Sequence, residues 1–119
     1  MSPELTKRDL VFCSVNKDID MKIIPLMVFR EKEGATLIIK KEQADEYGLE
    51  YDGIWDMITL NVNSDLKSIG FLAKITDSLA KESISVNPVS AYYHDHLFVL
   101  QEKSKDALKI LQDLSHSEK

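Results

Sequence analysis

Apolar and polar residues in the second half of the chain follow two different periods, which predict strands and helices. Apolar residues alternate with polar ones toward the end of residues 54–62, which predicts a strand with one buried face. Over residues 65–82 apolar residues return every three or four positions, so we expect an amphipathic helix, with Ser64 as its N-cap. A second hairpin and a closing helix should follow, with Pro88 indicating a sheet edge or bulge. These elements are expected at residues 83–93 (strand), 96–101 (strand) and 103–114 (helix).

The first half shows a related but weaker pattern. Residues 9–15 are apolar and rich in β-branched side chains, which predicts a strand. Two further strand-like runs, at residues 26–30 and 35–40, lie on either side of Gly34, which suits a hairpin turn. A short polar helix follows, and Gly48 is positioned to end it.

The two halves repeat one layout, in which an opening strand is followed by a hairpin and then a helix. The second half has the order strand, helix, strand, strand, helix, which is the ferredoxin-like α+β plan of an antiparallel sheet with helices on one face. The first half is degenerate, because the helix after its opening strand is nearly absent. We place the halves at residues 1–53 and 54–119. Since no Gly-, Ser- or Pro-rich linker separates them, we expect one compact unit.

Charge and cysteine content narrow the class of protein. Among 119 residues there are 15 basic and 20 acidic ones, a formal net charge of −5. This disfavours nucleic-acid binding, because phosphates are neutralised by clustered Lys and Arg. The one cysteine, Cys13, lies in an apolar run and is predicted to be a small buried residue. No apolar run approaches the roughly 18 residues of a membrane span. We therefore expect a cytoplasmic protein with no membrane partner and no cofactor.

A family resemblance rests on "TLNVNSDL", on Gly70 shortly after it, on "ISVNPVSAYYHDH" and, in the first half, on "FREKEGATLI". These stretches resemble the ACT domain, and the chain resembles small bacterial stand-alone proteins with two tandem ACT-like domains. The resemblance implies a regulatory module that binds amino acids or other small ligands, often between paired domains. ACT domains usually enter their first helix through an Asp-x-Pro-Gly-type loop. Here Asn63, Ser64, Asp65 and Leu66 stand at that turn.

This turn is the first candidate ligand site. A helix N-terminus offers unpaired N–H groups and a partial positive charge, which suit a carboxylate. Asn63 and Ser64 would add hydrogen bonds, Asp65 would meet an ammonium group, and Gly70 would let a ligand approach closely. Asn87, on the following strand, would face the same pocket. The alternative is structural: Ser64 caps the helix, Asp65 interacts with its dipole, and Gly70 permits helix packing.

The second candidate is the triplet His94, Asp95 and His96. Two histidines two positions apart on a strand share a face and can ligate a metal. The same triplet can instead form the hairpin turn, because His and Asp are among the non-glycine residues enriched at positive φ. We favour the turn, placed at His94-Asp95 or Asp95-His96. Tyr92 and Tyr93 would then belong to the strand, with one buried and the other exposed.

Together these observations favour a non-catalytic regulatory or sensing module rather than an enzyme. Its expected ligand is a small-molecule effector, with an amino acid the leading candidate, bound at the strand-to-helix turn and the interface between the ACT-like halves. The alternative is a metal-binding protein or a small metal-dependent hydrolase that uses His94, Asp95 and His96. Unpaired sheet edges also leave a homodimer open.

Overall fold

The computed structural model describes residues 2–16, 22–61 and 70–117, and their fold is α+β with a six-stranded antiparallel sheet, which confirms the predicted class. No helix in these ranges is long and apolar enough to cross a membrane. The elements in chain order are β1 (Pro3–Val15), β2 (Met27–Arg30), β3 (Ala35–Lys40), α1 (Lys41–Glu46), β4 (Trp55–Leu60), α2 (Phe71–Lys81), β5 (Val86–Ser90), β6 (Asp95–Leu100), the 3₁₀ turn η1 (Gln101–Lys103) and α3 (Ser104–Ser117).

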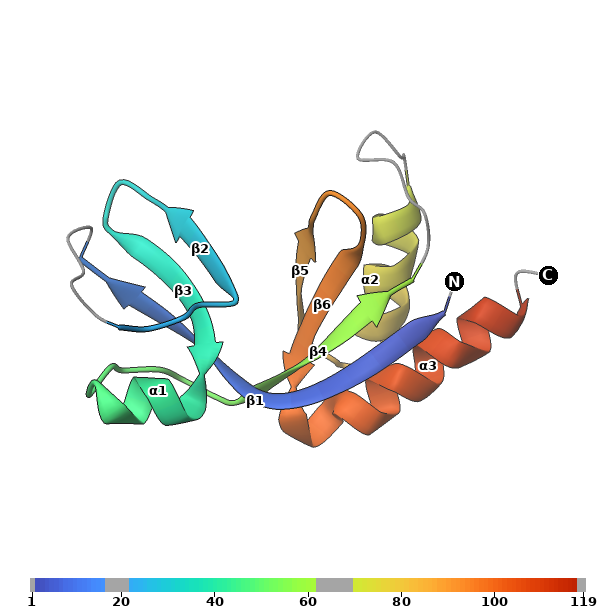
Figure 1. Cartoon of the computed structure of the whole chain (residues 1–119). Helices are drawn as coiled ribbons and strands as arrows, with labels where there is room; N and C mark the ends of the chain where they lie inside the picture. The colour runs from blue at the N-terminus through green and yellow to red at the C-terminus, as the bar shows by residue number, and fades with distance from the viewer. Residues whose placement is uncertain (1, 17–21, 62–69, 118–119) are drawn as a thin grey trace. The chain divides into compact units, whose positions relative to one another are not determined.

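The chain forms two compact units. The N-terminal unit is Arg8–Trp55, and the C-terminal unit is Met1–Lys7 together with Asp56–Lys119. Strand β1 contributes to both, as Figure 1 shows, and the sheet order is β2-β3-β1-β4-β6-β5. The N-terminal unit therefore holds β2, β3 and the second part of β1, while the C-terminal unit holds the first part of β1 beside β4, β6 and β5.

Strand β1 is longer than the strand predicted over residues 9–15. Its first residues, Pro3–Lys7, give the C-terminal unit a fourth strand beside β4, which completes the ferredoxin-like sheet. Most side chains in this stretch are polar, so it carries no strong strand pattern. Leu5 is the exception, because it is half-buried and packs against the core of the C-terminal unit. Beyond the end of β4, Asn61 donates its backbone N–H to the carbonyl of Ser2 at 3.1 Å.

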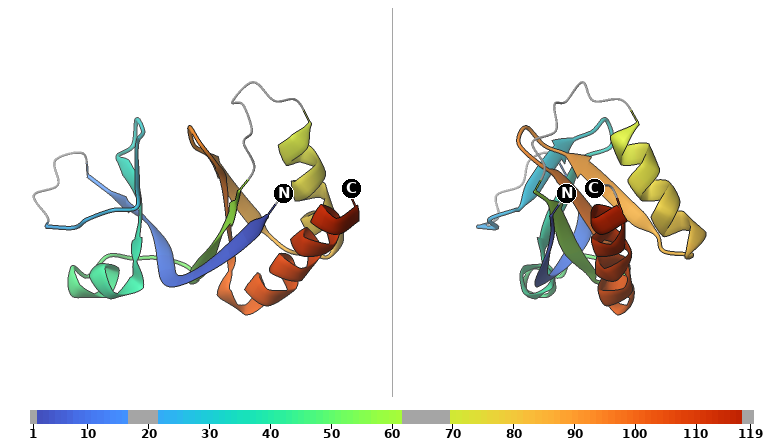
Figure 2. Two further views of the ribbon diagram at one scale, coloured as in Figure 1. Left: turned by 45° about the vertical axis from the view of Figure 1, so that its right-hand side comes forward. Right: turned by 90° about the vertical axis from the view of Figure 1, so that its right-hand side faces the viewer.

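The core of the C-terminal unit lies between its sheet and two helices. Figure 2 shows α2 and α3 on the same side of β4, β5 and β6. The predicted alternation of β4 and the predicted apolar stripes of both helices supply most of this core. The buried core residues are Ile58, Leu60, Ile75, Leu79, Ile84, Leu97, Val99, Ala107 and Leu111. Pro88 lies in β5, an edge strand, as its missing N–H predicted.

A smaller core holds the N-terminal unit together. It consists of apolar side chains from β1 and β3, with Ala44 from α1. Cys13 belongs to this core and is 3% exposed, which confirms the prediction of a buried structural cysteine. Burial raises the pKa of the Cys13 thiol, so the reactive thiolate form is disfavoured. This cysteine is therefore unsuited to act as a nucleophile.

Helices α1 and α2 end in the same hydrogen-bonded motif. After α1, the N–H of Gly48 donates to the carbonyl of Asp45 at 3.2 Å, and Gly48 has a φ of 64°. After α2, the N–H of Ser83 donates to the carbonyl of Ala80 at 2.9 Å, and Ser83 has a φ of 60°. Both are Schellman ends, in which a left-handed residue follows the helix. The prediction that Gly48 ends α1 is thus confirmed. Ser83 adopts the same left-handed conformation, although its side chain makes that conformation less favourable than it is for glycine.

Helix α2 begins later than the sequence predicts. It starts at Phe71, with Gly70 as its N-cap at a φ of 84°, so the helix predicted over residues 65–82 does not run through Gly70. The predicted N-cap, Ser64, lies outside the described residues. The apolar periodicity over residues 65–82 correctly predicts a helix and where it ends, but it does not predict where the helix begins.

Candidate functional site

The strand-to-helix turn is described only at its two ends. The predicted ligand residues Asn63, Ser64 and Asp65 lie outside the described residues. Gly70 is exposed, and a Cβ placed on it would meet no atom of the other described residues within 4 Å. No acidic side chain stands in the first turn of α2, so no carboxylate of this turn offsets the partial positive charge at the start of the helix.

The two described asparagines of the C-terminal unit have different surroundings. Asn61 is exposed, and its side-chain amide donates to Oε2 of Glu4 at 3.1 Å, so it fastens β4 to β1. Asn87 is also exposed and pairs across the hairpin with Phe98 of β6. The side chain of Asn87 therefore lies at the surface of the edge strand β5 and outside the core.

The turn of the second hairpin lies earlier than the sequence predicts. Ser90 on β5 pairs with Asp95 on β6, and Ala91 donates its N–H to the carbonyl of His94 at 3.0 Å. Residues 92–93 therefore form the tip of the hairpin. Both predicted placements of the turn within the His-Asp-His triplet are wrong, because Asp95 already belongs to the paired part of β6.

The first hairpin closes in the same way. Arg30 pairs with Ala35, and the N–H of Glu31 donates to the carbonyl of Gly34 at 2.7 Å. Gly34 therefore occupies the place that His94 has in the second hairpin. The two hairpins therefore turn at equivalent positions of the repeat, over residues 31–34 in the first and residues 91–94 in the second.

The two tyrosines at the second tip are both exposed, at 75% for Tyr92 and 71% for Tyr93. Their rings meet edge to face with centroids 4.9 Å apart. The prediction that one of them is buried is wrong, because both belong to the turn and neither lies on a strand face.

The histidine triplet is held by contacts within the C-terminal unit. Nδ1 of His96 lies 3.0 Å from Oγ1 of Thr59, and Ser90 donates its hydroxyl to Oδ1 of Asp95 at 2.6 Å. The rings of His94 and His96 have centroids 6.1 Å apart. Among the described residues, no three His, Cys, Asp or Glu side chains gather closely enough to hold a metal ion. These contacts are those of a structural hairpin end, and the described residues bring no third metal ligand to His94 and His96.

His96 should make the protein less stable in mild acid. Burial, and secondarily the charge of His94, lower its pKa from the ordinary 6.5. The unfolded chain then binds a proton more readily than the folded one, so stability is complete above about 6.5 and is lost as pH falls toward the folded pKa. The slope for one proton cannot exceed about 1.4 kcal/mol per pH unit. Urea unfolding at several pH values should show this loss, and His96→Gln should reduce it; an unchanged slope would contradict the assignment.

Asp56 is a buried carboxylate that the sequence reading missed. It is fully buried in β4, where Oδ1 accepts a bond from Nε2 of Gln101 at 3.4 Å, while Oδ2 has no partner among the described residues. Asp56 falls on the same alternation as Ile58 and Leu60, which are both buried. This alternation was the feature of the sequence that could have predicted the burial of Asp56. Buried carboxylate oxygens are normally hydrogen-bonded, so Oδ2 of Asp56 is an exception among the described residues.

Comparison with known proteins gives the family. Sequence profiles of the ACT domain match residues 1–55 and residues 53–113. A Vibrio cholerae protein of unknown function, described as a possible transport protein, has a solved structure that is 41% identical, covers 94% of this chain and 88% of its own, and gives a TM-score of 0.86. No curated protein matches the chain.

More distant structures share the fold. An Agrobacterium tumefaciens protein is 14% identical and has a TM-score of 0.75 over 93% of this chain and 86% of its own. The ligand-free regulatory subunit of aspartate kinase from Thermus thermophilus is 12% identical and has a TM-score of 0.68 over 93% of this chain and 94% of its own. With ACT profiles matched to both halves, the chain belongs to the ACT domain family.

Proposed function

We propose that this protein is a non-catalytic regulatory module that binds a small metabolite, specifically a free amino acid. The observation that carries the proposal is the pair of ACT domain matches, which together span residues 1–113. The likeness in fold to the regulatory subunit of aspartate kinase supports a regulatory role. ACT domains typically act by binding small effectors, so both halves of the chain contribute to the proposal.

The proposed ligand site is the turn that precedes α2. Asn63 and Ser64 would hydrogen-bond the ligand, and Asp65 would pair with its ammonium group. The lack of a side chain at Gly70 supports this proposal, because no other described residue lies close to it and a ligand can approach the helix backbone there. The exposed amide of Asn87 remains part of the proposal as a further polar contact.

Thermal unfolding in the presence of each of the twenty amino acids tests this function. A ligand that binds only the folded state at about 100 times its Kd stabilises it by about 2.7 kcal/mol, which should raise the midpoint by several degrees. Asn63→Ala should reduce that rise. Gln112→Ala removes an exposed amide side chain on α3, away from this turn, and should leave the rise unchanged. If no amino acid moves the midpoint at millimolar concentrations, the proposal fails.

A further inference from the structure

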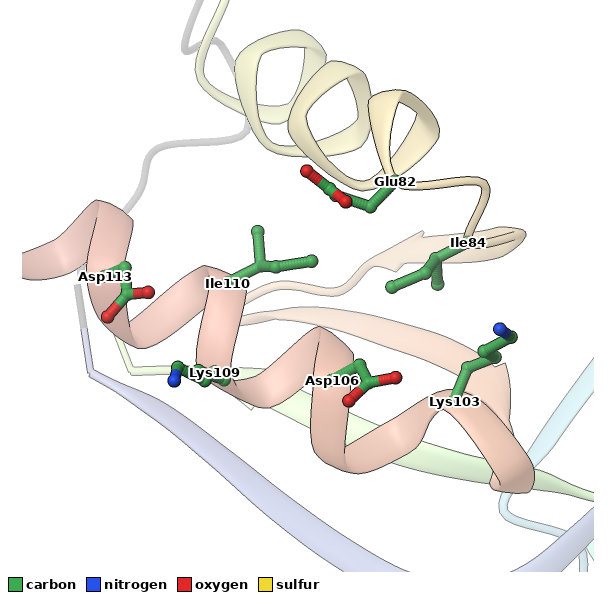
Figure 3. Close-up of a pocket in the computed structure, with 7 residues that line it drawn as sticks. All are labelled: Glu82, Ile84, Lys103, Asp106, Lys109, Ile110 and Asp113. Atoms are coloured by element: carbon green, nitrogen blue, oxygen red, sulfur yellow. The ribbon is translucent and has the colours of Figure 1, made fainter.

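A pocket of about 320 Å³ lies in the C-terminal unit between α3 and the turn that follows α2 (Figure 3). Its volume falls at the lower end of the range for small-molecule sites. Ile84 and Ile110 give it an apolar part, and Figure 3 shows both side chains in the space between α3 and the α2 end. The pocket lies at the opposite end of α2 from Gly70, about 16 Å away along an 11-residue helix.

Charged side chains surround these isoleucines. Glu82 comes from the end of α2 and the rest come from η1 and α3 (Figure 3). None of them makes an ion pair or hydrogen bond through its side chain with another described residue. Their charges are therefore available to a ligand. The charged lining residues are Glu82, Lys103, Asp106, Lys109 and Asp113.

The charges are arranged in two groups along α3. Figure 3 shows Lys103 and Asp106 toward the start of the helix and Lys109 and Asp113 further along it. Asp106 and Asp113 are two helical turns apart, a rise of about 10 Å. Each end of the pocket thus offers a carboxylate near an ammonium group, with aliphatic surface between the ends. Counting Glu82, the three carboxylates exceed the two ammonium groups by one.

We propose that this pocket binds a free amino acid with a positively charged side chain. The ligand's two cationic groups, one at each end of an aliphatic chain, would meet carboxylates at the two ends of the pocket. Its α-carboxylate would meet a lysine ammonium, and its methylenes would cover Ile84 and Ile110. The single excess negative charge of the lining matches the single excess positive charge of such a ligand. This second site does not depend on the proposed site before α2.

NMR titration of ¹⁵N-labelled protein with L-arginine tests the proposal. Amide shifts should concentrate at residues 82–84 and 103–113, with a millimolar Kd because exposed ion pairs are weak. L-citrulline, which lacks the side-chain charge, and agmatine, which lacks the carboxylate, should each bind about three- to fivefold more weakly. Equal affinity for arginine and citrulline would overturn the proposal.

Variants of α3 separate this site from other arginine contacts. Asp106→Asn and Lys109→Gln should each weaken arginine binding by about three- to fivefold. Lys105→Gln makes the same change as Lys109→Gln at an exposed position outside the pocket and should have no effect. If arginine shifts amides only beside Gly70, the pocket is not a site, while the proposed function stands. If arginine shifts amide signals at the pocket but no amino acid shifts those near Gly70, the pocket is a site and the proposed site before α2 fails.

Discussion

Replacing Gly34 by alanine should destabilise the N-terminal unit by about 2–3 kcal/mol. A Cβ at Gly34 would stand well inside van der Waals contact with the carbonyl oxygen of Val15. That oxygen is backbone, and Val15 pairs with Ala35 at the end of the β1–β3 ladder, so it cannot move aside as a flexible side chain would. The added methyl must therefore displace either the end of β1 or the hairpin turn that contains Gly34.

Unfolding in guanidinium, followed by tryptophan fluorescence, measures this loss where it occurs. Trp55 is the one tryptophan, and its ring packs edge to face on Phe12 with centroids 5.6 Å apart inside the same unit. Gly48→Ala is the matched control, because a Cβ there meets no described atom within 4 Å and only its φ of 64° is unfavourable. The control should cost about 1 kcal/mol. Equal losses would show that the close approach of Gly34 to Val15 is not a constraint.

The two hairpins show both how far the sequence predicts the fold and where it fails. Alternation and the repeat placed all four hairpin strands to within a few residues. The turn was then assigned by residue preference, because His and Asp often adopt positive φ. Among the described non-glycine residues, positive φ occurs at Asp9 and Ser83, neither of which lies in a hairpin turn. The internal repeat is the better guide, because His94 stands at the position equivalent to Gly34 and each of them closes a four-residue turn.

Residues at the N-terminus could not be predicted from pattern alone. Pro3–Lys7 become a strand because β4 has an open edge that can accept hydrogen bonds, which is a property of the folded unit. The pocket beside α3 was equally hidden. Lys103, Asp106 and Asp113 look like an ordinary solvated helix face, and only the end of α2, with Glu82, turns that face into one side of a cavity. The family resemblance predicts a ligand site at the turn before α2, but no pattern in the sequence predicts the pocket beside α3.

Replacing Leu79 by alanine should lower the free energy of unfolding of the C-terminal unit by about 3 kcal/mol. Leu79 is fully buried among residues of β4, β6 and α3, and its carbonyl accepts the N–H of Ile84 in the Schellman end of α2. Truncation leaves a cavity that neighbouring side chains can fill only in part. Far-UV circular dichroism in guanidinium follows the loss, since α2 and α3 both belong to this unit.

Leu72→Ala is the matched control for this loss. It makes the same substitution on the same helix, so the change in intrinsic helix propensity is the same and cancels in the comparison. Leu72 is only partly buried against the same core, and its truncation should cost about 1 kcal/mol. A difference of about 2 kcal/mol would show that α2 is seated through Leu79, near the end that bounds the pocket. Equal losses would mean that the core stabilises α2 equally at both leucines. The position of Glu82 would then not depend on Leu79 in particular.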